Sequence, residues 1–275
     1  MIEIKNFSFS YGQTQVFENL SLQFQSGAIY GLLGENGVGK TTLLKTISGL
    51  LRPSAGSCTV DEQVSFDRKP EFLQRVFFLP DEVPLPDSAT PDSFFRDLAA
   101  FYPNQSLEMF NHLAKELEID PMRKFRQMSF GQQKKSLLAA ALALNTDYLL
   151  LDEPTNGLDI PSKADFRRIL MERLGSESTI IISTHQVKDV ENLIDPIIII
   201  SNNNVLLNAS MERIAQKLYF EYGSEKDPNA LYSELMPNGW LNVLPNDGRG
   251  ESQVNIEALF NAVHNKRGLI HSLFN

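Results

Sequence analysis

The sequence predicts an α/β protein whose core is a mostly parallel sheet. Residues 148–151, 180–182 (after Thr179) and 197–200 are continuously apolar, and stretches of helical periodicity lie between them. Strands of this kind are buried on both faces, as in parallel sheets that are covered by helices. A glycine-rich loop at residues 34–39 lies between an apolar strand and a helix, an arrangement typical of doubly wound folds.

The N-terminal segment predicts an antiparallel β subdomain. Apolar residues alternate at Ile2 and Ile4 and again from Leu20 to Phe24, with a turn near residues 11–13 between the two runs. An apolar strand follows at residues 27–33, and the helix after the glycine-rich loop ends before Pro53.

Helical periodicity predicts a helical subdomain between about residues 85 and 145. Its last helix is expected from about Ser129 to Leu144. Ser129 is a suitable N-cap, and Gln132, three residues later, can bond back to it.

The second half of the chain alternates between expected strands and helices up to about residue 216. Helices are predicted near residues 162–174 and 187–194, and an edge strand is predicted at residues 205–209. Beyond this point the sequence is rich in turns and ends in an amphipathic segment near residues 256–263. We therefore expect one domain over residues 1–216 and a small accessory module over residues 217–275.

Composition restricts the class of protein. The chain has 25 basic and 34 acidic residues, a net charge of −9, which argues against a non-specific nucleic-acid binder. A single cysteine, Cys58, excludes an intrachain disulfide and fits a reducing compartment. Because no apolar run approaches the roughly 18 residues that span a bilayer, we expect that the chain itself does not cross a membrane.

The segment "GENGVGKTT" matches the phosphate-loop pattern G-x-x-x-x-G-K-[ST]. Its glycines let the backbone amides converge on a phosphate chain, and the following helix adds its positive N-terminal field. Lys40 supplies a charge for the β- and γ-phosphates, and the Thr41 hydroxyl can ligate Mg²⁺. An incidental glycine-rich turn is the alternative, but the strand before and the helix after disfavour it. The predicted ATP contacts in this loop are Gly34, Glu35, Asn36, Gly37, Val38, Gly39, Lys40, Thr41 and Thr42.

A second polar site follows the predicted core strand in "YLLLDEPTNGLD". Ligands bind at the C-terminal edge of open parallel sheets, where Asp152 and Glu153 are expected. Asp152 is predicted to hold Mg²⁺, and Glu153 is predicted to act as the general base for an attacking water. His185 ends the next predicted strand in the same way and can contact a γ-phosphate, although a lone histidine is more often structural.

These motifs, in this order, resemble the ATP-binding cassette (ABC) ATPases over about residues 1–215. The resemblance implies a P-loop NTPase cassette with ATP and Mg²⁺ as its ligands. It further implies a head-to-tail dimer in which each ATP lies between the phosphate loop of one subunit and the signature turn of the other. The resemblance also implies a role for each of these residues. Tyr11 would stack on the adenine with Val16 nearby, Asp152 would be the Walker B acid, and Glu153 would be the catalytic base. His185 would be the switch histidine, Asp159 would be the D-loop acid at the dimer interface, and Ser129, Gly131 and Gln132 would contact the partner's ATP.

Two positions depart from the family pattern. The signature turn reads "MSFGQ", so Phe130 stands where the family has the first of two adjacent glycines. We expect its ring to point away from the nucleotide and to pack on the helical region or on the partner subunit. Asp81 aligns with the glutamine of the family's Q-loop, and its carboxylate is predicted to approach Mg²⁺ or the attacking water.

Within the family, the single cassette, the short helical insert and the C-terminal tail resemble bacterial exporter-type ATPase subunits. That branch implies a separate integral membrane permease, a location at the cytoplasmic face of the cell membrane, a second cassette in a homodimer and no nucleic-acid partner. A soluble cassette acting on ribosomes or DNA is the main alternative. The single cassette, and the lack of heptads or zinc-type cysteines, count against it. A regulatory ATP binder without hydrolysis is disfavoured by the intact Asp152–Glu153 pair.

Overall fold

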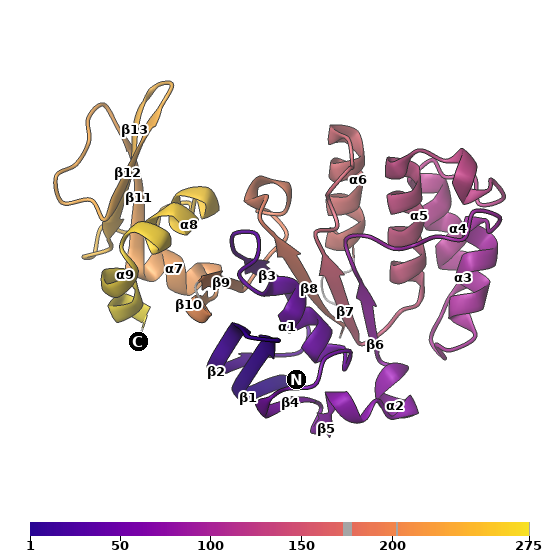
Figure 1. Ribbon diagram of the computed structural model, residues 1–275. Coiled ribbons are helices and arrows are strands. Elements are labelled where there is room, and N and C mark those ends of the chain that lie inside the picture. The colour runs from indigo at the N-terminus through magenta and orange to yellow at the C-terminus, as the bar shows by residue number, and fades with distance from the viewer. Residues whose placement is uncertain (173–177, 202, 275) are drawn as a thin grey trace.

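A computed structural model describes residues 1–172, 178–201 and 203–274 of the chain. The central feature of the described part is a six-stranded sheet (Figure 1). Neighbouring strands are parallel except at one edge, where β10 runs antiparallel to β9 and forms the predicted edge strand. In order across the sheet, the strands are β10 (Asn204–Ala209), β9 (Ile197–Ser201), β3 (Ile29–Leu33), β8 (Thr179–Thr184), β7 (Tyr148–Asp152) and β6 (Val76–Leu79).

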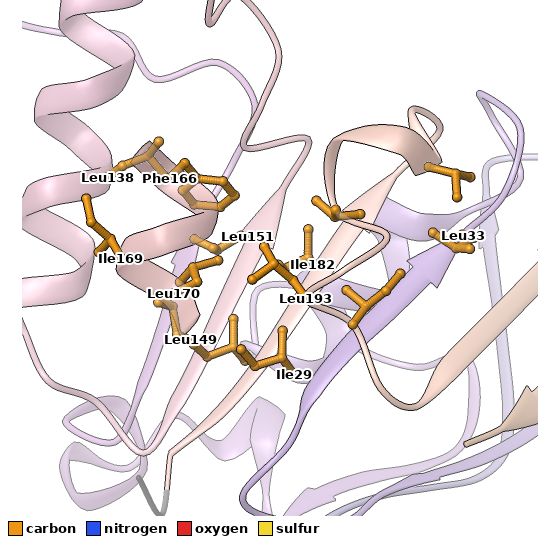
Figure 2. Packing of buried hydrophobic residues seen from close by; sticks show 14 of the residues in the cluster. Ile29, Leu33, Leu138, Leu149, Leu151, Phe166, Ile169, Leu170, Ile182 and Leu193 are labelled. Atoms are coloured by element: carbon orange, nitrogen blue, oxygen red, sulfur yellow. The ribbon is translucent and has the colours of Figure 1, made fainter. Parts of the chain in front are cut away.

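Helices cover both faces of this sheet because its strands are apolar on both sides. Leu149 and Leu151 of β7 pack in one cluster with α5 (Phe130–Ala143) and α6 (Ile160–Met171). Leu150, which points to the opposite face, packs in a second cluster with α1 (Lys40–Ile47). Figure 2 shows the first cluster, where Phe166, Ile169 and Leu170 of α6 lie over β7. The parallel sheet with helices on both faces confirms the predicted fold class.

The N-terminal β subdomain is antiparallel, as predicted. Its strand order is β2–β1–β4–β5, and Phe7, Phe17 and Phe24 are fully buried in the cluster that also includes residues of α1. The elements are β1 (Ile2–Tyr11), β2 (Thr14–Phe24), β4 (Ala55–Val60), β5 (Gln63–Val64), the 3₁₀ turn η1 (Ser65–Asp67) and α2 (Pro70–Leu73).

The helical subdomain lies beyond the β6 edge of the core sheet (Figure 1). It contains α3 (Pro91–Ala99), α4 (Leu107–Glu116), the 3₁₀ turn η2 (Phe125–Gln127) and α5. The rings of Phe95 and Phe110 stack with centroids 4.5 Å apart and hold α3 against α4.

The C-terminal segment forms a third sheet at the opposite end of the molecule (Figure 1). The sequence predicted only turns here, because the strands are short and carry mixed polar and apolar residues. The predicted amphipathic segment is α8, which buries Ile256, Leu259 and Val263 in the same cluster as β9 and β10 residues. The predicted division at residues 216 and 217 stays a prediction. The elements are α7 (Met211–Lys217), β11 (Leu218–Gly223), β12 (Tyr232–Met236), β13 (Gly239–Pro245), α8 (Ile256–Asn265) and α9 (Arg267–Phe274).

The prediction of a helix near residues 187–194 is wrong. Only the 3₁₀ turn η3 (Val187–Asp189) forms there, and the backbone leaves helical geometry at Val190 with φ −130°. Val187, Val190 and Leu193 are buried at a spacing of three, which imitates a helical stripe along an irregular segment. For the helix predicted at residues 162–174, the structure gives α6 to Met171, and residue 174 lies outside the described residues.

Among the described residues, no helix combines the length and the apolar character that are needed to cross a bilayer.

Candidate functional site

A pocket of about 540 Å³ opens where β3, β7 and β8 end. Most of the predicted ATP, Mg²⁺ and catalytic residues line it, together with two residues that the sequence analysis did not single out, Thr14 and Asn156. The lining residues are Tyr11, Thr14, Val16, Asn36, Gly37, Gly39, Lys40, Thr41, Thr42, Asp81, Asp152, Glu153, Asn156 and His185.

The phosphate loop bends tightly between β3 and α1. Gly39 has φ +106°, and a Cβ placed on it would lie 2.6 Å from the Phe17 ring, so only glycine fits there. α1 begins at Lys40 with no described side chain capping its first turn. Its first amide groups can therefore donate to an anion, which is how helix N-termini bind phosphate.

The Lys40 side chain is almost fully buried at the floor of this loop. Its Nζ donates to the carbonyl oxygens of Gly34 (2.7 Å) and Glu35 (3.1 Å) and lies 3.5 Å from Glu153 Oε1. Burial lowers the pKa of the Lys40 ammonium, and the Glu153 carboxylate opposes that shift. Gly34 and Glu35 do not line the pocket; their carbonyl oxygens instead hold the Lys40 ammonium in place.

Val38 lies behind the loop instead of lining the pocket. Its Cγ2 would be 2.7 Å from a Cβ built on Gly34, and its side chain packs against the apolar cluster that contains α1. Its predicted ATP contact could come only from its backbone.

Oxygen atoms of Thr41 and Asp152 meet across the pocket. Thr41 Oγ1 donates to Asp152 Oδ2 at 2.7 Å, and Ser183 Oγ donates to Asp152 Oδ1. Mg²⁺ is commonly held by one or two protein oxygens together with substrate phosphates, so the side-chain oxygens of Thr41 and Asp152 are suitable ligands for the ion. The described residues contain no cluster of three or more His, Cys, Asp or Glu side chains that would hold a metal by themselves.

Glu153 and His185 form a hydrogen-bonded pair beside the phosphate loop. His185 Nδ1 lies 2.9 Å from Glu153 Oε1, and since an ionised carboxylate only accepts, Nδ1 is the donor. Glu153 has φ +45°, an uncommon conformation that the bond from its amide to Ser183 O (3.0 Å) helps to hold. The pair therefore presents one oriented carboxylate at the pocket.

Tyr11 forms the outer edge of the pocket. Its side chain is half exposed, and its ring meets Phe9 edge-on with centroids 4.9 Å apart. Thr14 lies directly opposite Tyr11 in the β1–β2 register, so the short turn between these strands was the signal that could have revealed it.

Asp81 reaches the pocket wall with both carboxylate oxygens already engaged. Lys134 Nζ lies 3.0 Å from Asp81 Oδ1, and Asn156 Nδ2 donates to Asp81 Oδ2 at 3.1 Å. The predicted approach of Asp81 to Mg²⁺ or to water stays a prediction. Neither Lys134 nor Asn156 was singled out from the sequence, because pairing between distant segments has no local signal.

The signature turn lies outside this pocket. Ser129, Gly131 and Gln132 are absent from its lining, and Ser129 caps α5 instead. The reciprocal bonds of the predicted capping box are present, from Gln132 N to Ser129 Oγ (3.3 Å) and from Ser129 N to Gln132 Oε1 (3.1 Å).

Phe130 is absent from the pocket lining, and its predicted packing on the helical region or on the partner subunit stays a prediction. Its half-exposed ring covers Gly157 in the turn after β7, where a Cβ would lie 2.2 Å from Phe130 Cε1. Asp159, which ends the same turn, is exposed and caps α6 by accepting from Ser162 N at 3.0 Å. Hydrogen bonds from Ser162 hold the pKa of Asp159 below its usual value.

Comparison with known proteins identifies the class. Residues 17–156 match the ABC transporter family. ABC transporter ATP-binding protein YtrB of Bacillus subtilis is 30% identical over 206 residues, covering 74% of this chain and 70% of that protein. Nod factor export ATP-binding protein I of Burkholderia lata is 32% identical over 253 residues, covering 85% and 80%. A solved dimeric ABC transporter cassette shares the fold, with a TM-score of 0.68 at 22% identity over 76% of this chain and 98% of that one.

The chain therefore belongs to the ABC transporter family. It is an ATP-binding subunit of this class, and the activity of the class is ATP hydrolysis.

Proposed function

We propose that the chain hydrolyses ATP in the pocket at the end of β3, β7 and β8 and so drives export through a separate membrane permease. One observation carries the catalytic part of this proposal. Lys40, Thr41, Asp152, Glu153 and His185, which come from four separate elements or loops, line a single pocket. Phosphoryl transfer to water requires a positive charge at the phosphates, oxygen ligands for Mg²⁺ and a group that orients the water. Lys40 can supply the charge, Thr41 and Asp152 the oxygen ligands, and Glu153 the oriented carboxylate.

In this mechanism the triphosphate lies along the phosphate loop, residues 34–42. The amides of the loop and of the first turn of α1 donate to the phosphate oxygens, and Lys40 turns its ammonium from the loop carbonyls toward the β- and γ-phosphates. Tyr11 stacks on the adenine, with Val16 beside it. Thr41 and Asp152 hold Mg²⁺, which when bound supplies positive charge to the phosphates.

Glu153 is the general base of the proposed reaction. Its carboxylate orients the attacking water and accepts a proton from it. His185 orients both carboxylate oxygens, because Nδ1 donates to Oε1 at 2.9 Å and the backbone amide donates to Oε2 at 3.4 Å. With Nδ1 as the donor, Nε2 donates to the γ-phosphate only when both ring nitrogens of the imidazole carry protons. Asp81 stands at the pocket wall, where Lys134 and Asn156 already bond both of its carboxylate oxygens.

The proposal includes a second copy of the chain. The solved relative with this fold is described as dimeric, and Ser129, Gly131, Gln132 and Asp159 all lie outside the pocket of their own chain. In a head-to-tail pair, the signature turn of one copy covers the nucleotide of the other, and Asp159 lies at the interface. Such a symmetric arrangement forms two equivalent sites.

Support for export comes from a relative that is described as an export ATP-binding protein. The permease is a separate integral membrane chain, and the ATPase binds it at the cytoplasmic face of the membrane. The alternative, a soluble cassette that acts on ribosomes or DNA, has no observation in its favour here.

Purification of the chain from cells under gentle detergent conditions tests the proposal. We expect Mg²⁺-dependent ATP hydrolysis by the purified chain and recovery of one multispanning membrane protein with it. Recovery of ribosomes or DNA without a membrane protein would support the alternative. A protein that binds ATP without hydrolysing it would contradict the catalytic assignment.

A further inference from the structure

Lys134 is a fully buried lysine on the second turn of α5. Only 2% of its surface is exposed, an unusual position for an ammonium group unless a partner compensates its charge. Its partner is Asp81, whose backbone oxygen accepts from Lys134 Nζ at 2.7 Å and whose Oδ1 accepts at 3.0 Å. The lysine therefore joins the signature helix to the loop after β6.

The connection continues along the pocket wall. Asp81 Oδ2 accepts from Asn156 Nδ2 at 3.1 Å, and Asn156 Oδ1 accepts from Gln186 Nε2 at 3.3 Å. Asp81 and Asn156 both line the nucleotide pocket, whereas Lys134 lies behind them. The carboxylate of Asp81 is thus fixed from two sides at the edge of the site.

The negative charge of Asp81 would disfavour phosphate binding in this pocket if Lys134 did not compensate it. Asp152 and Glu153 already place two carboxylates in this pocket, and a triphosphate adds several more negative charges. A third carboxylate at the wall would repel the phosphates, since like charges a few ångströms apart interact strongly in a partly buried site. Paired with Lys134, Asp81 contributes no net charge, as the family's glutamine contributes none.

We propose that Lys134 is a positioning residue for ATP binding: it holds Asp81 at the pocket wall and cancels the charge that Asp81 would otherwise direct at the phosphates. This inference rests on the proposed function, because it requires the triphosphate in this pocket. Lys134 acts through Asp81 and does not touch the nucleotide.

The test is a double-mutant cycle on nucleotide affinity. ATP and ADP binding are measured by fluorescence competition for the unmodified protein, Lys134→Met, Asp81→Asn and the double variant. We expect Lys134→Met to weaken ATP binding about tenfold, and ADP binding less because ADP carries fewer charges. The double variant, neutral at both positions, should bind ATP within about twofold of the unmodified protein.

Lys135→Met is the matched control. Lys135 is the next residue on the same helix, and its Nζ donates to Leu117 O at 3.2 Å rather than to Asp81. We expect this variant, with the same change in net charge, to bind ATP as the unmodified protein does. Lys134→Arg, which keeps the positive charge, should recover most of the lost affinity.

Two results would overturn the inference: unchanged ATP affinity in folded Lys134→Met, or a double variant that binds ATP at least tenfold more weakly than the unmodified protein. The second comparison holds even if Lys134→Met fails to fold, because it uses only the neutral pair. Failure of the unmodified protein to bind ATP would instead contradict the proposed function, so the two failures are distinguishable.

Discussion

The phosphate loop and the signature turn are both glycine-containing entries to helices, yet they stand in very different surroundings. The phosphate loop ends at α1 without a side-chain cap and lies in a pocket with Asp152, Glu153 and His185. The signature turn ends at α5 with a complete capping box and lies at the surface. One entry leaves its first amide groups for a ligand, while the other already bonds the amides of Ser129 and Gln132 within its own chain.

In the proposed dimer, this difference means that each chain supplies the catalytic half of one site and the covering half of the other. Groups that carry out phosphate chemistry are assembled by the sheet of one chain. Ser129 and Gly131 lie outside the pocket of that chain, so their predicted contact with ATP requires another copy. Substitutions on the two sides should therefore have different effects on binding, turnover and dimerisation.

The largest expected effect is on turnover, on the catalytic side. Glu153→Gln keeps the size of the side chain and its bond to His185 but removes the base, so kcat should fall roughly a thousandfold. ATP affinity should change little, and ATP should still promote dimer formation. The measurement is steady-state phosphate release beside equilibrium ATP binding. Rapid turnover by this variant would exclude Glu153 as the base.

The next effect is on ATP affinity. Lys40→Ala removes the buried ammonium that we propose turns toward the phosphates, and ATP affinity should fall roughly a hundredfold. Calorimetric titration of the monomer with ATP measures this loss. Lys40 also bonds the loop carbonyls, so the melting temperature of the Lys40→Ala variant is compared with that of the unmodified protein to check that the variant is folded. Unchanged affinity in the folded variant would contradict the phosphate-loop assignment.

A change on the covering side should leave ATP binding to the monomer intact. Ser129→Asp keeps an N-cap side chain, since aspartate caps helices as well as serine does, but adds a negative charge toward the partner's phosphates. ATP-dependent dimerisation should weaken roughly tenfold, measured by analytical ultracentrifugation. Ser129→Ala is the comparison, because it removes the cap and should cost about 1 kcal/mol of stability. Loss of monomer ATP binding by Ser129→Asp would place Ser129 in its own chain's site.

The smallest effect is expected at Phe130. Its ring covers Gly157 and not the pocket, so Phe130→Gly should keep ATPase activity within about twofold. Helix propensity falls with the new glycine, so a small drop in melting temperature accompanies the change. Activity assays and thermal melting are sufficient to check both. Abolished activity would mean that the aromatic ring contributes to the site.

The sequence was most informative where chemistry and local geometry coincide. Lys40, Asp152 and Glu153 follow strands with clear apolar patterns, so their meeting at one sheet edge was predictable. The Ser129–Gln132 capping box was also local and was confirmed. The three-stranded C-terminal sheet and the irregular segment after His185 were not predictable, because burial against distant elements overrides the local pattern there.

Side-chain contacts between distant segments that no motif or strand end brings together could not be predicted. Lys134 is one of two adjacent lysines in a helix, and nothing near it in the sequence points to Asp81, 53 positions away. The packing of Phe130 on Gly157 was likewise missed, since it depends on how α5 and the turn after β7 meet in space.

Complementation between two impaired variants, one on each side of the proposed shared site, tests the central claim most directly. Glu153→Gln and Ser129→Asp proteins are mixed before ATP is added, and phosphate release is compared with that of each variant alone. In a head-to-tail dimer, each mixed pair holds one complete site, so the mixture should recover roughly a quarter of the unmodified rate. A mixture no more active than the average of the two variants would contradict the account, because it would mean that each chain completes its own site.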